Sequence, residues 1–598
     1  MSSKRLALYP SAPNTARGQA TKISSHGSKV VYANARSIII RDLENDSAVT
    51  AYAGHIQPTT VARISPSGYY CASADTSGLV RIWDTVGEEN ILKGEYRVLG
   101  GRINDLAWDG ESKRIIAVGD GREKFGHAFM METGSSTGDI IGHSKPINAV
   151  AIRHQRPFRA ATAADDGIIA FHNGVPFKYD KTIKTHSKFV QSLCYSSSGD
   201  HFASAGSDFK VFVYDGKTGE NAIEIPNAHT GTVYAVSWSP DNRTLLTSAA
   251  DRTVKLWDVE TQKSIISWTV GDDIQSQQVG NTWAGKSSDT GIVSVSLSGD
   301  LNIFDKRSSS GPVKILQGVQ KAVTSATVTS DGTYIAGSAD GRVVAFSDNG
   351  VASVVKGEGH SNFVSGLSST ANSVWSAGYD DHVRAIFDGA FQQPGISTAS
   401  QPKGIAAFGD LAFVIESDSI EIVKPGSKTI KKALLSYDPS AIGVSSSGVV
   451  AVGGNDHQVH ILDQDLTEKG KMEGNKGPIT AISFSPDSKL VAVGDSAGKI
   501  VVYDVAERKA TISRWTYHSA KITSLSWASD SKRLVSGSLD THVYVWDVAR
   551  PAKNIAIKNA VPGGVNAVNW IEANGLKGKI GASGADPCIR FWEVIFHA

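Results

Sequence analysis

Cysteine and methionine are scarce in this 598-residue sequence, which contains three of the first and four of the second. Cys71, Cys194 and Cys588 lie far apart, with no CxxC pair and no Cys/His spacing typical of zinc ligands. This pattern argues against a disulfide framework and against a structural zinc site, and it fits a reducing compartment. We therefore expect no metal and no cofactor.

The sequence also lacks an excess of charge and a long apolar run. Lys and Arg number 60 against 59 Asp and Glu, so the formal net charge is +1. A nucleic-acid binder usually has a basic excess, so that class of partner is not favoured. No segment reaches the length of a membrane span, and the opening "MSSKRLALYPS" lacks the apolar centre of a signal peptide. We expect a soluble intracellular protein without membrane or nucleic-acid partners.

Glycine and strand-forming residues are abundant. The chain has 59 Gly, with many Thr, Ser and Val, and this mixture favours turns and β-strands over helices. At 598 residues it is too long for one ordinary hydrophobic core. Two or more all-β domains are therefore the starting expectation.

An internal repeat with a period near 40–45 residues organises the whole chain. Each unit ends in an aromatic or apolar residue followed by Asp, or in a weaker version of that pair. Fourteen such pairs occur, at Arg41-Asp42, Trp83-Asp84, Met131-Glu132, His172-Asn173, Tyr214-Asp215, Trp257-Asp258, Phe304-Asp305, Phe346-Ser347, Phe387-Asp388, Ile422-Val423, Leu462-Asp463, Tyr503-Asp504, Trp546-Asp547 and Trp592-Glu593. This period, with Gly-His early and Trp-Asp late, is the WD-repeat signature, in which each unit supplies the four strands of a propeller blade.

Two repeats carry a complete set of the residues that WD blades join by buried hydrogen bonds. Removing one partner from such a set leaves the others without a hydrogen bond, which costs about 1–3 kcal/mol of stability. We therefore interpret these histidines as structural and not as catalysts or ligands. In a third repeat Ser77 stands in the Asp position, which predicts an incomplete set. The two complete sets are His229, Thr247, Asp251 and Trp257, and His518, Ser536, Asp540 and Trp546.

Fourteen blades exceed the usual four to eight of one ring, so we predict two tandem seven-bladed propellers. The expected domains are residues 14–357 and 358–598, with the boundary near Gly357. The chain ends five residues after Glu593, which leaves little for the outer strand of the last blade. We therefore expect residues 1–13, with the apolar "RLALY" at 5–9, to close the second propeller and protect its edge.

One segment imitates a nucleotide-binding motif. "GNTWAGKS" at 280–287 fits the phosphate-loop pattern, which requires a strand before the loop and a helix after it. The following residues alternate like strands, so we place this segment between two strands of blade six and interpret Lys286 as an exposed loop lysine. No other catalytic constellation is present, and we expect no enzyme.

A candidate binding surface lies on the face where the His-bearing loops and the Asp-bearing turns meet. Residues 122–124, in "GDGREKFGHAFMMETG" (119–134), occupy such a turn. A large aromatic residue stands third after the histidine in "HSKFV", where "HTGTV" has Thr232, and is a candidate binding anchor. The alternatives are a solvated turn charge at Glu123 and a Phe189 ring folded over the neighbouring blade. The predicted patch across blades three to five comprises Glu123, Lys124, Asp165, Tyr179 and Phe189.

The segments at 108–129, 176–208 and 9–43 closely resemble the actin-interacting protein 1 family. The stretch "GREKFGH" is far more specific to this family than the general Gly-His and Trp-Asp spacing. The resemblance covers the full length and implies fourteen repeats in two propellers. It also assigns the actin- and cofilin-directed surface to Glu123, Asp165, Tyr179 and Phe189, with Tyr179 standing where members have Phe.

This resemblance implies a monomeric cytoplasmic protein of the cytoskeleton, at cortical actin structures, whose partners are F-actin and cofilin/ADF. Members promote the severing of cofilin-decorated filaments and limit regrowth at barbed ends. A generic WD-repeat scaffold or adaptor of another multiprotein complex is the alternative. Pelleting with F-actin that rises when cofilin is present would distinguish the two.

Overall fold

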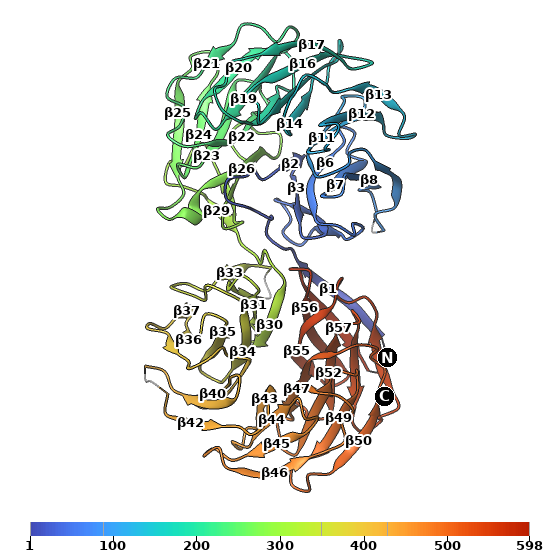
Figure 1. Ribbon diagram of the computed structural model, residues 1–598, viewed down its shortest axis with the longest axis vertical. Coiled ribbons are helices and arrows are strands. Elements are labelled where there is room, and N and C mark those ends of the chain that lie inside the picture. The colour runs from blue at the N-terminus through green and yellow to red at the C-terminus, as the bar shows by residue number, and fades with distance from the viewer. Residues whose placement is uncertain (1, 88, 348–349, 427–428, 597–598) are drawn as a thin grey trace. The chain divides into compact units, whose positions relative to one another are not determined.

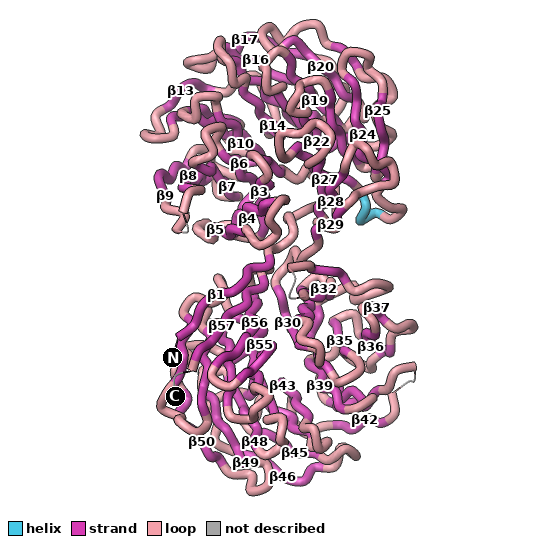
Figure 2. The backbone as a smooth tube through the Cα atoms, turned by 180° about the vertical axis from the view of Figure 1, so that it is seen from behind, coloured by secondary structure: helices cyan, strands magenta, loops and turns pink. Residues whose placement is uncertain are grey.

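The computed structural model describes residues 2–87, 89–347, 350–426 and 429–596. These residues form four-stranded antiparallel sheets, with a short extra strand in one of them, and a single 3-10 turn, η1 (Ile274–Ser276) (Figure 2). The chain divides into two compact units, Ala12–Gln317 and Met1–Ser11 with Gly318–Ala598. We call them the first and the second propeller, and each contains seven sheets among the described residues (Figure 1). The predicted all-β, two-propeller fold is confirmed.

The first propeller contains blades 1 to 7. The strands of each blade are given in order from the inner strand to the outer one. Blades 1 to 4 consist of β2 (Ile23–His26), β3 (Lys29–Asn34), β4 (Ser37–Asp42), β5 (Val49–Tyr52); β6 (Thr59–Ile64), β7 (Tyr70–Asp75), β8 (Leu79–Asp84), β9 (Leu92–Arg97); β10 (Ile103–Trp108), β11 (Arg114–Gly119), β12 (Gly126–Met130), β13 (Ser136–Asp139); and β14 (Ile147–Ile152), β15 (Arg159–Ala164), β16 (Ile169–Asn173), β17 (Lys178–Ile183). Blades 5 to 7 consist of β18 (Val190–Tyr195), β19 (His201–Gly206), β20 (Val211–Asp215), β21 (Ile223–Glu224); β22 (Val233–Trp238), β23 (Thr244–Ala249), β24 (Thr253–Asp258), β25 (Ser264–Thr269); and β26 (Gln278–Trp283), β27 (Ile292–Ser296), β28 (Leu301–Phe304), β29 (Lys314–Leu316).

The second propeller contains blades 8 to 14. Blades 8 to 11 consist of β30 (Val323–Val328), β31 (Tyr334–Ser338), β32 (Val343–Phe346), β33 (Ala352–Val354); β34 (Val364–Ser369), β35 (Val374–Gly378), β36 (His382–Phe387), with β37 (Ala390–Phe391) and β38 (Ile396–Ser397) both on β36; β39 (Gly404–Phe408), β40 (Leu411–Ile415), β41 (Ser419–Val423), β42 (Lys431–Leu434); and β43 (Pro439–Val444), β44 (Val450–Gly454), β45 (Val459–Leu462), β46 (Glu468–Met472). Blades 12 to 14 consist of β47 (Ile479–Phe484), β48 (Leu490–Asp495), β49 (Ile500–Asp504), β50 (Ala510–Trp515); β51 (Ile522–Trp527), β52 (Arg533–Ser538), β53 (Val543–Asp547), β54 (Asn554–Ile557); and β55 (Val565–Asn574), β56 (Lys577–Gly584), β57 (Ile589–Ile595) with β1 (Ser2–Tyr9).

The hydrophobic core lies between successive blades and not inside any one of them. Small residues such as Ala72 and Ala74 on β7 of blade 2 face large residues such as Leu106, Trp108 and Phe129 of blade 3 across one such layer. A sheet buried on both faces needs apolar residues at nearly every position, which explains the continuous apolar runs of the middle strands. No blade can bury both faces alone, so each blade depends on its two neighbours.

Side chains of the inner strands also tie neighbouring blades together. In several blades the side chain of the second residue of the inner strand donates a hydrogen bond to a backbone carbonyl of the next inner strand. Thr480 Oγ1 lies 2.6 Å from Ile522 O, and Thr523 Oγ1 lies 2.6 Å from Val565 O. The same bond closes the second ring, because Asn566 Nδ2 donates to Val323 O at 2.7 Å.

Strand β1 completes blade 14 from the other end of the sequence. It pairs antiparallel with β57 from Ser2 opposite Ile595 to Tyr9 opposite Ile589. The Tyr9 ring is 5% exposed, and its centroid lies 4.9 Å from that of Phe591. The prediction that the N-terminal strand closes the second propeller is therefore confirmed.

The boundary between the propellers differs from the expected one near Gly357. Blade 8, whose third strand ends at the pair Phe346-Ser347, belongs to the second propeller, so the division falls between Gln317 and Gly318. The reason lies in ring closure, because Tyr334 of blade 8 places its hydroxyl 2.8 Å from Ser583 Oγ of blade 14. Counted from Arg41-Asp42, the seventh pair is Phe304-Asp305, and the expected boundary was one blade too late. Met1 and Ala598, the ends of the expected ranges, lie outside the described residues.

We predict that Tyr9→Ala destabilises the second propeller alone. Losing a buried ring of this size costs about 3 kcal/mol, and Tyr9 contacts Phe346, Ser347 and Phe591 of that propeller. Hydrogen exchange should accelerate in the β57 amides and stay unchanged in β4. Leu6→Ala, at a side chain 49% exposed, is the matched control on the same strand. Unchanged exchange in β57, even after deletion of residues 1–10, would contradict the closure.

Candidate functional site

A chain of buried hydrogen bonds in blade 6 joins four side chains. His229 Nδ1 lies 2.9 Å from Asp251 Oδ2, and His229 Nε2 lies 2.8 Å from Thr247 Oγ1. Trp257 Nε1 donates to the same hydroxyl at 2.9 Å. The N–H of Thr230 also donates to Asp251, at 3.0 Å. The loop before the inner strand is thereby fixed to the turn between the second and third strands.

Blade 13 repeats this arrangement. His518 lies 2.9 Å from both Asp540 Oδ2 and Ser536 Oγ, and Trp546 Nε1 donates to Ser536 at 2.8 Å. Three further blades make the two histidine contacts without the tryptophan. These are His143 with Asp166 and Thr162, His186 with Asp208 and Ser204, and His360 with Asp380 and Ser376.

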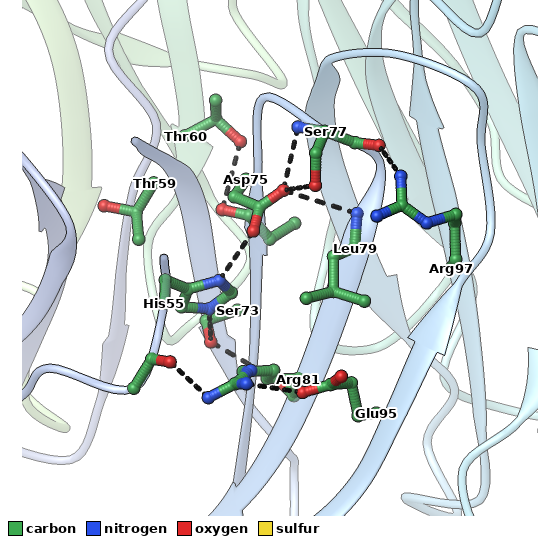
Figure 3. A network of polar contacts seen from close by, with 12 residues as sticks. His55, Thr59, Thr60, Ser73, Asp75, Ser77, Leu79, Arg81, Glu95 and Arg97 are labelled. Carbon is green, nitrogen blue, oxygen red and sulfur yellow. Dashed lines mark hydrogen bonds and ion pairs between the residues drawn. The ribbon is translucent and has the colours of Figure 1, made fainter. Parts of the chain in front are cut away.

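Blade 2 contains a complete set that the sequence pattern did not predict. His55 lies 3.0 Å from Asp75 and 2.7 Å from Ser73, to which Trp83 Nε1 donates at 3.1 Å. Asp75 stands two positions before Ser77, the residue assigned to the Asp slot, and accepts hydrogen bonds from its N–H and hydroxyl (Figure 3). That assignment was wrong because Asp75, the last residue of β7, reaches the ring from the strand end, two positions before the turn residue that carries the carboxylate in blade 6.

Burial and hydrogen bonding shift the pKa values of these groups. Burial lowers the pKa of the His55, His229 and His518 imidazoles, although their partner carboxylates oppose the shift. Burial alone would raise the pKa of Asp75 and Asp251, but the hydrogen bonds that each accepts outweigh it and hold the pKa below its usual range. Because the rings are enclosed and fully partnered, they serve the fold.

These links define one face of the first propeller, which we call the tetrad face. It carries the loops before the inner strands and the turns between the second and third strands. In an antiparallel blade the other two turns lie on the opposite face. Glu123 and Lys124 are exposed in the turn between β11 and β12 of blade 3, so they lie on the tetrad face. Arg122 beside them adopts the left-handed region, at φ 65°.

Asp165 and Phe189 line one pocket of about 780 Å³ on this face, between blades 4, 5 and 6. Phe189 is 45% exposed, and the Lys145 ammonium lies 5.9 Å from its ring centroid. The ring is therefore partly exposed, and Lys145 of the neighbouring blade 4 lies over it. Asp165 is half-buried and accepts a hydrogen bond of 2.7 Å from Asn148 Nδ2. Glu123, Lys124 and Tyr179 do not line this pocket.

Tyr179 lies on β17, the outer strand of blade 4, and is 40% exposed. Its ring packs against Gly142, where an added Cβ would meet the ring at 2.7 Å, and its hydroxyl lies 2.7 Å from Thr182 Oγ1. Gly142 precedes the histidine of blade 4, so Tyr179 flanks a loop of the tetrad face. The hydroxyl that distinguishes it from Phe is held within its own strand.

Three residues of the pocket were missed by the sequence reasoning. They are Lys145, Lys188 and Phe209. The repeated "HSK" at 143–145 and 186–188 could have indicated the lysines. Phe209 could have been found as the aromatic residue that follows Asp208, where blade 4 has glycine.

The segment "GNTWAGKS" does not form a phosphate-binding loop. Gly280–Trp283 lie within β26, the inner strand of blade 7, whereas we expected a connection between two strands of blade 6, and no helix follows before β27. An added Cβ at Gly280 would lie 2.4 Å from Thr21 O, so this glycine permits close packing of the first blade. Elsewhere in the described part of the chain, no group of three or more His, Cys, Asp or Glu side chains could hold a metal ion. Within the same residues, none of the helical structure is long and apolar enough to cross a membrane.

Comparison with known proteins gives both repeat-family and full-length matches. The repeat family described as "WD domain, G-beta repeat" matches residues 47–84, 177–215, 221–258 and 310–347, and "Nucleolar protein 10-like, N-terminal domain" matches residues 421–582. Actin-interacting protein 1 of Drosophila melanogaster is 37% identical over 98% of this chain and 97% of its own length. WD repeat-containing protein 1 of Xenopus tropicalis (98% and 99%) and the 66 kDa stress protein of Physarum polycephalum (98% and 98%) are also 37% identical.

We predict that Asp75→Ala destabilises the first propeller more than Ser77→Ala does. The first change leaves His55, the Ser77 N–H and the Leu79 N–H without their acceptor, which costs about 2–3 kcal/mol. The second removes one hydroxyl and costs about 1 kcal/mol or less. Urea unfolding of the two variants measures the difference. Equal losses of unfolding free energy in the two variants would contradict the assignment of Asp75, and not Ser77, as the acidic partner of His55.

The buried histidines predict a loss of stability in mild acid. Their folded pKa lies below the usual 6.5, so the unfolded chain binds more protons as the pH falls below that value. Their contribution to stability is complete above pH 6.5 and is lost as the pH falls through the folded pKa. The melting temperature should therefore decrease from pH 7 to pH 5 and stay level between pH 7 and 8. A constant melting temperature down to pH 5 would contradict this.

Proposed function

This chain belongs to the family of actin-interacting protein 1 and WD repeat-containing protein 1, and from that membership we propose that it binds cofilin-decorated actin filaments and promotes their disassembly. The match extends over both propellers, so the relative whose name states an interaction with actin corresponds to this chain almost from end to end. The proposed partners are F-actin and cofilin/ADF, and the proposed setting is the cytoplasm, at the cortical cytoskeleton, with the protein acting as a monomer.

The observation that carries the proposal is the composition of the tetrad face on blades 3 to 5. It combines exposed charges at Glu123 and Lys124 with the exposed Phe189 ring, Asp165 lies in the pocket beside Phe189, and the exposed Tyr179 ring flanks this face from the outer strand β17. Aromatic residues usually supply most of the binding energy at an interface, whereas rim charges steer and align the partner. These five residues are the proposed actin- and cofilin-binding site.

Disassembly by this surface requires no reaction catalysed by the chain. A protein that binds a deformed filament more tightly than an undeformed one shifts the population toward the deformed state by its differential affinity. Preferential binding to the cofilin-bound conformation therefore promotes severing, and occupation of a barbed end blocks regrowth. The directionality comes from nucleotide hydrolysis within actin itself.

We predict that Phe189→Ala and Glu123→Ala weaken pelleting with cofilin-decorated F-actin while leaving the melting temperature nearly unchanged. Both side chains are exposed, so their loss leaves the folded core intact. Truncation of an anchoring ring costs about 2 kcal/mol of binding, roughly a thirty-fold loss of affinity. Cosedimentation with and without cofilin, followed by imaging of single filaments, measures the effect.

Matched controls lie on the opposite face of the same propeller. Tyr69→Ala removes a ring that is 61% exposed in the turn between β6 and β7, and Glu260→Ala removes an exposed carboxylate in the turn between β24 and β25. Both controls should bind as the wild type does. Equal losses in the control and site variants would place the interaction elsewhere, and the absence of any pelleting by the wild type would overturn the proposed function.

A further inference from the structure

We propose that the pocket on the tetrad face binds an acidic side chain of the protein partner together with an apolar neighbour of that side chain. The pocket lies between blades 4, 5 and 6, and its walls include Lys145, Asp165, Lys188, Phe189, Phe209 and Thr232. This inference rests on the proposed function, because it takes the decorated filament as the partner and assigns the chemistry of the contact.

Two ammonium groups stand over two exposed rings in this pocket. Lys145 Nζ lies 5.9 Å from the Phe189 centroid, and Lys188 Nζ lies 5.4 Å from the Phe209 centroid. The rings are 45% and 39% exposed. Among the described residues, neither ammonium group forms an ion pair with a carboxylate, and Asp166 and Asp208 are paired instead with His143 and His186, at 3.2 and 2.9 Å. The cations are therefore held in place by aromatic faces while their charge remains available to a ligand.

The carboxylates of the pocket are already engaged by donors of the protein. Asp165 accepts from Asn148 Nδ2 at 2.7 Å. Asp166 accepts from His143 Nδ1 at 3.2 Å and from the Ser144 N–H at 3.0 Å. These donors fix the carboxylate oxygens in the loops without removing their charge, and beside them the pocket presents two ammonium groups and two phenyl rings to a ligand. A carboxylate beside an apolar side chain complements both features.

The backbone supplies a separate observation at Phe209. This residue follows the tetrad Asp208 and has φ 71°, a left-handed conformation that side chains with a Cβ disfavour and glycine adopts readily. The equivalent position of blade 4 is Gly167, with φ 77°. The same left-handed conformation follows the tetrad Asp in blades 6, 9 and 13, at Arg252, Asp381 and Thr541, so it belongs to the turn of the repeat. Phe209 differs from these residues in placing a large ring, 39% exposed, in the pocket beside Phe189, where it can contact an apolar group of the partner.

The first test removes the charge of both lysines and keeps polar side chains of similar length. The double variant Lys145→Gln, Lys188→Gln should bind cofilin-decorated F-actin about ten-fold more weakly and lose most of the gain in affinity that the wild type shows when salt is lowered from about 200 to about 50 mM. The matched control, Lys217→Gln with Lys263→Gln, removes two exposed lysines from turns on the opposite face. It should retain the affinity and salt dependence of the wild type.

The second test separates binding from folding at the strained position. Phe209→Gly relieves the left-handed strain, so the melting temperature should stay level or rise while affinity for the decorated filament falls about ten-fold. Arg252→Gly makes the same change at the equivalent turn of blade 6, where φ is 67°, outside the pocket. It should leave the affinity unchanged. A purely structural role for Phe209 would lower the melting temperature instead.

The outcomes distinguish this inference from the function on which it rests. If Phe189→Ala weakens binding but the double lysine variant binds as the wild type does, acid recognition is overturned and the proposed function stands. If the double lysine variant and its control weaken binding equally, the loss of affinity comes from the lower net charge of the protein. Acid recognition by the pocket is then overturned as well. If the wild type fails to bind the decorated filament, the proposed function falls, and this partner assignment falls with it.

Discussion

The hydrogen bond between a buried histidine and the aspartate of a neighbouring turn is the interaction on which the tetrad face depends. In blades 4, 5, 6 and 13 the same carboxylate also accepts the N–H that follows the histidine, as from Ser187 to Asp208 at 3.0 Å. Two bonds to one carboxylate fix both the position and the direction of the loop. The residue three positions after the histidine, such as Phe189, is therefore presented from a rigid base.

Blades without this link satisfy their buried polar groups in other ways. Blade 10 places Glu416 and Glu421 inside the fold, 0% and 3% exposed, and one ammonium group, that of Lys432, lies 2.8 and 3.0 Å from them. Blade 7 contains a buried amide and hydroxyl network in which Asn302 donates to Ser296 Oγ at 2.8 Å. The ring tolerates such variation because packing between blades supplies the core, while the polar links orient the loops.

A ring of this kind separates the requirements of folding from those of recognition. Middle strands are buried on both faces and are largely apolar, with buried polar side chains such as Thr247 and Ser536 held by partners, whereas the loops of the tetrad face tolerate charge and exposed rings. The pocket on blades 4 to 6 meets both requirements. Its acidic residues hold the loops in place, and its lysines and phenylalanines face outward. Disassembly by selective binding suits such a surface, since a rigid site discriminates between filament conformations without energy of its own.

Local periodicity, residue type and fixed spacing were enough to predict the all-β class, the fourteen repeats, the strand that closes the last blade, and the two tetrads around His229 and His518. The structure was needed to show that blade 8 belongs to the second ring, that Asp75 and not Ser77 binds His55, and that Phe209 joins Phe189 in one pocket. The first depends on which blades meet at ring closure, as in the contact between Tyr334 and Ser583. The other two depend on which side chains converge in three dimensions, and repeat spacing carries no information about that.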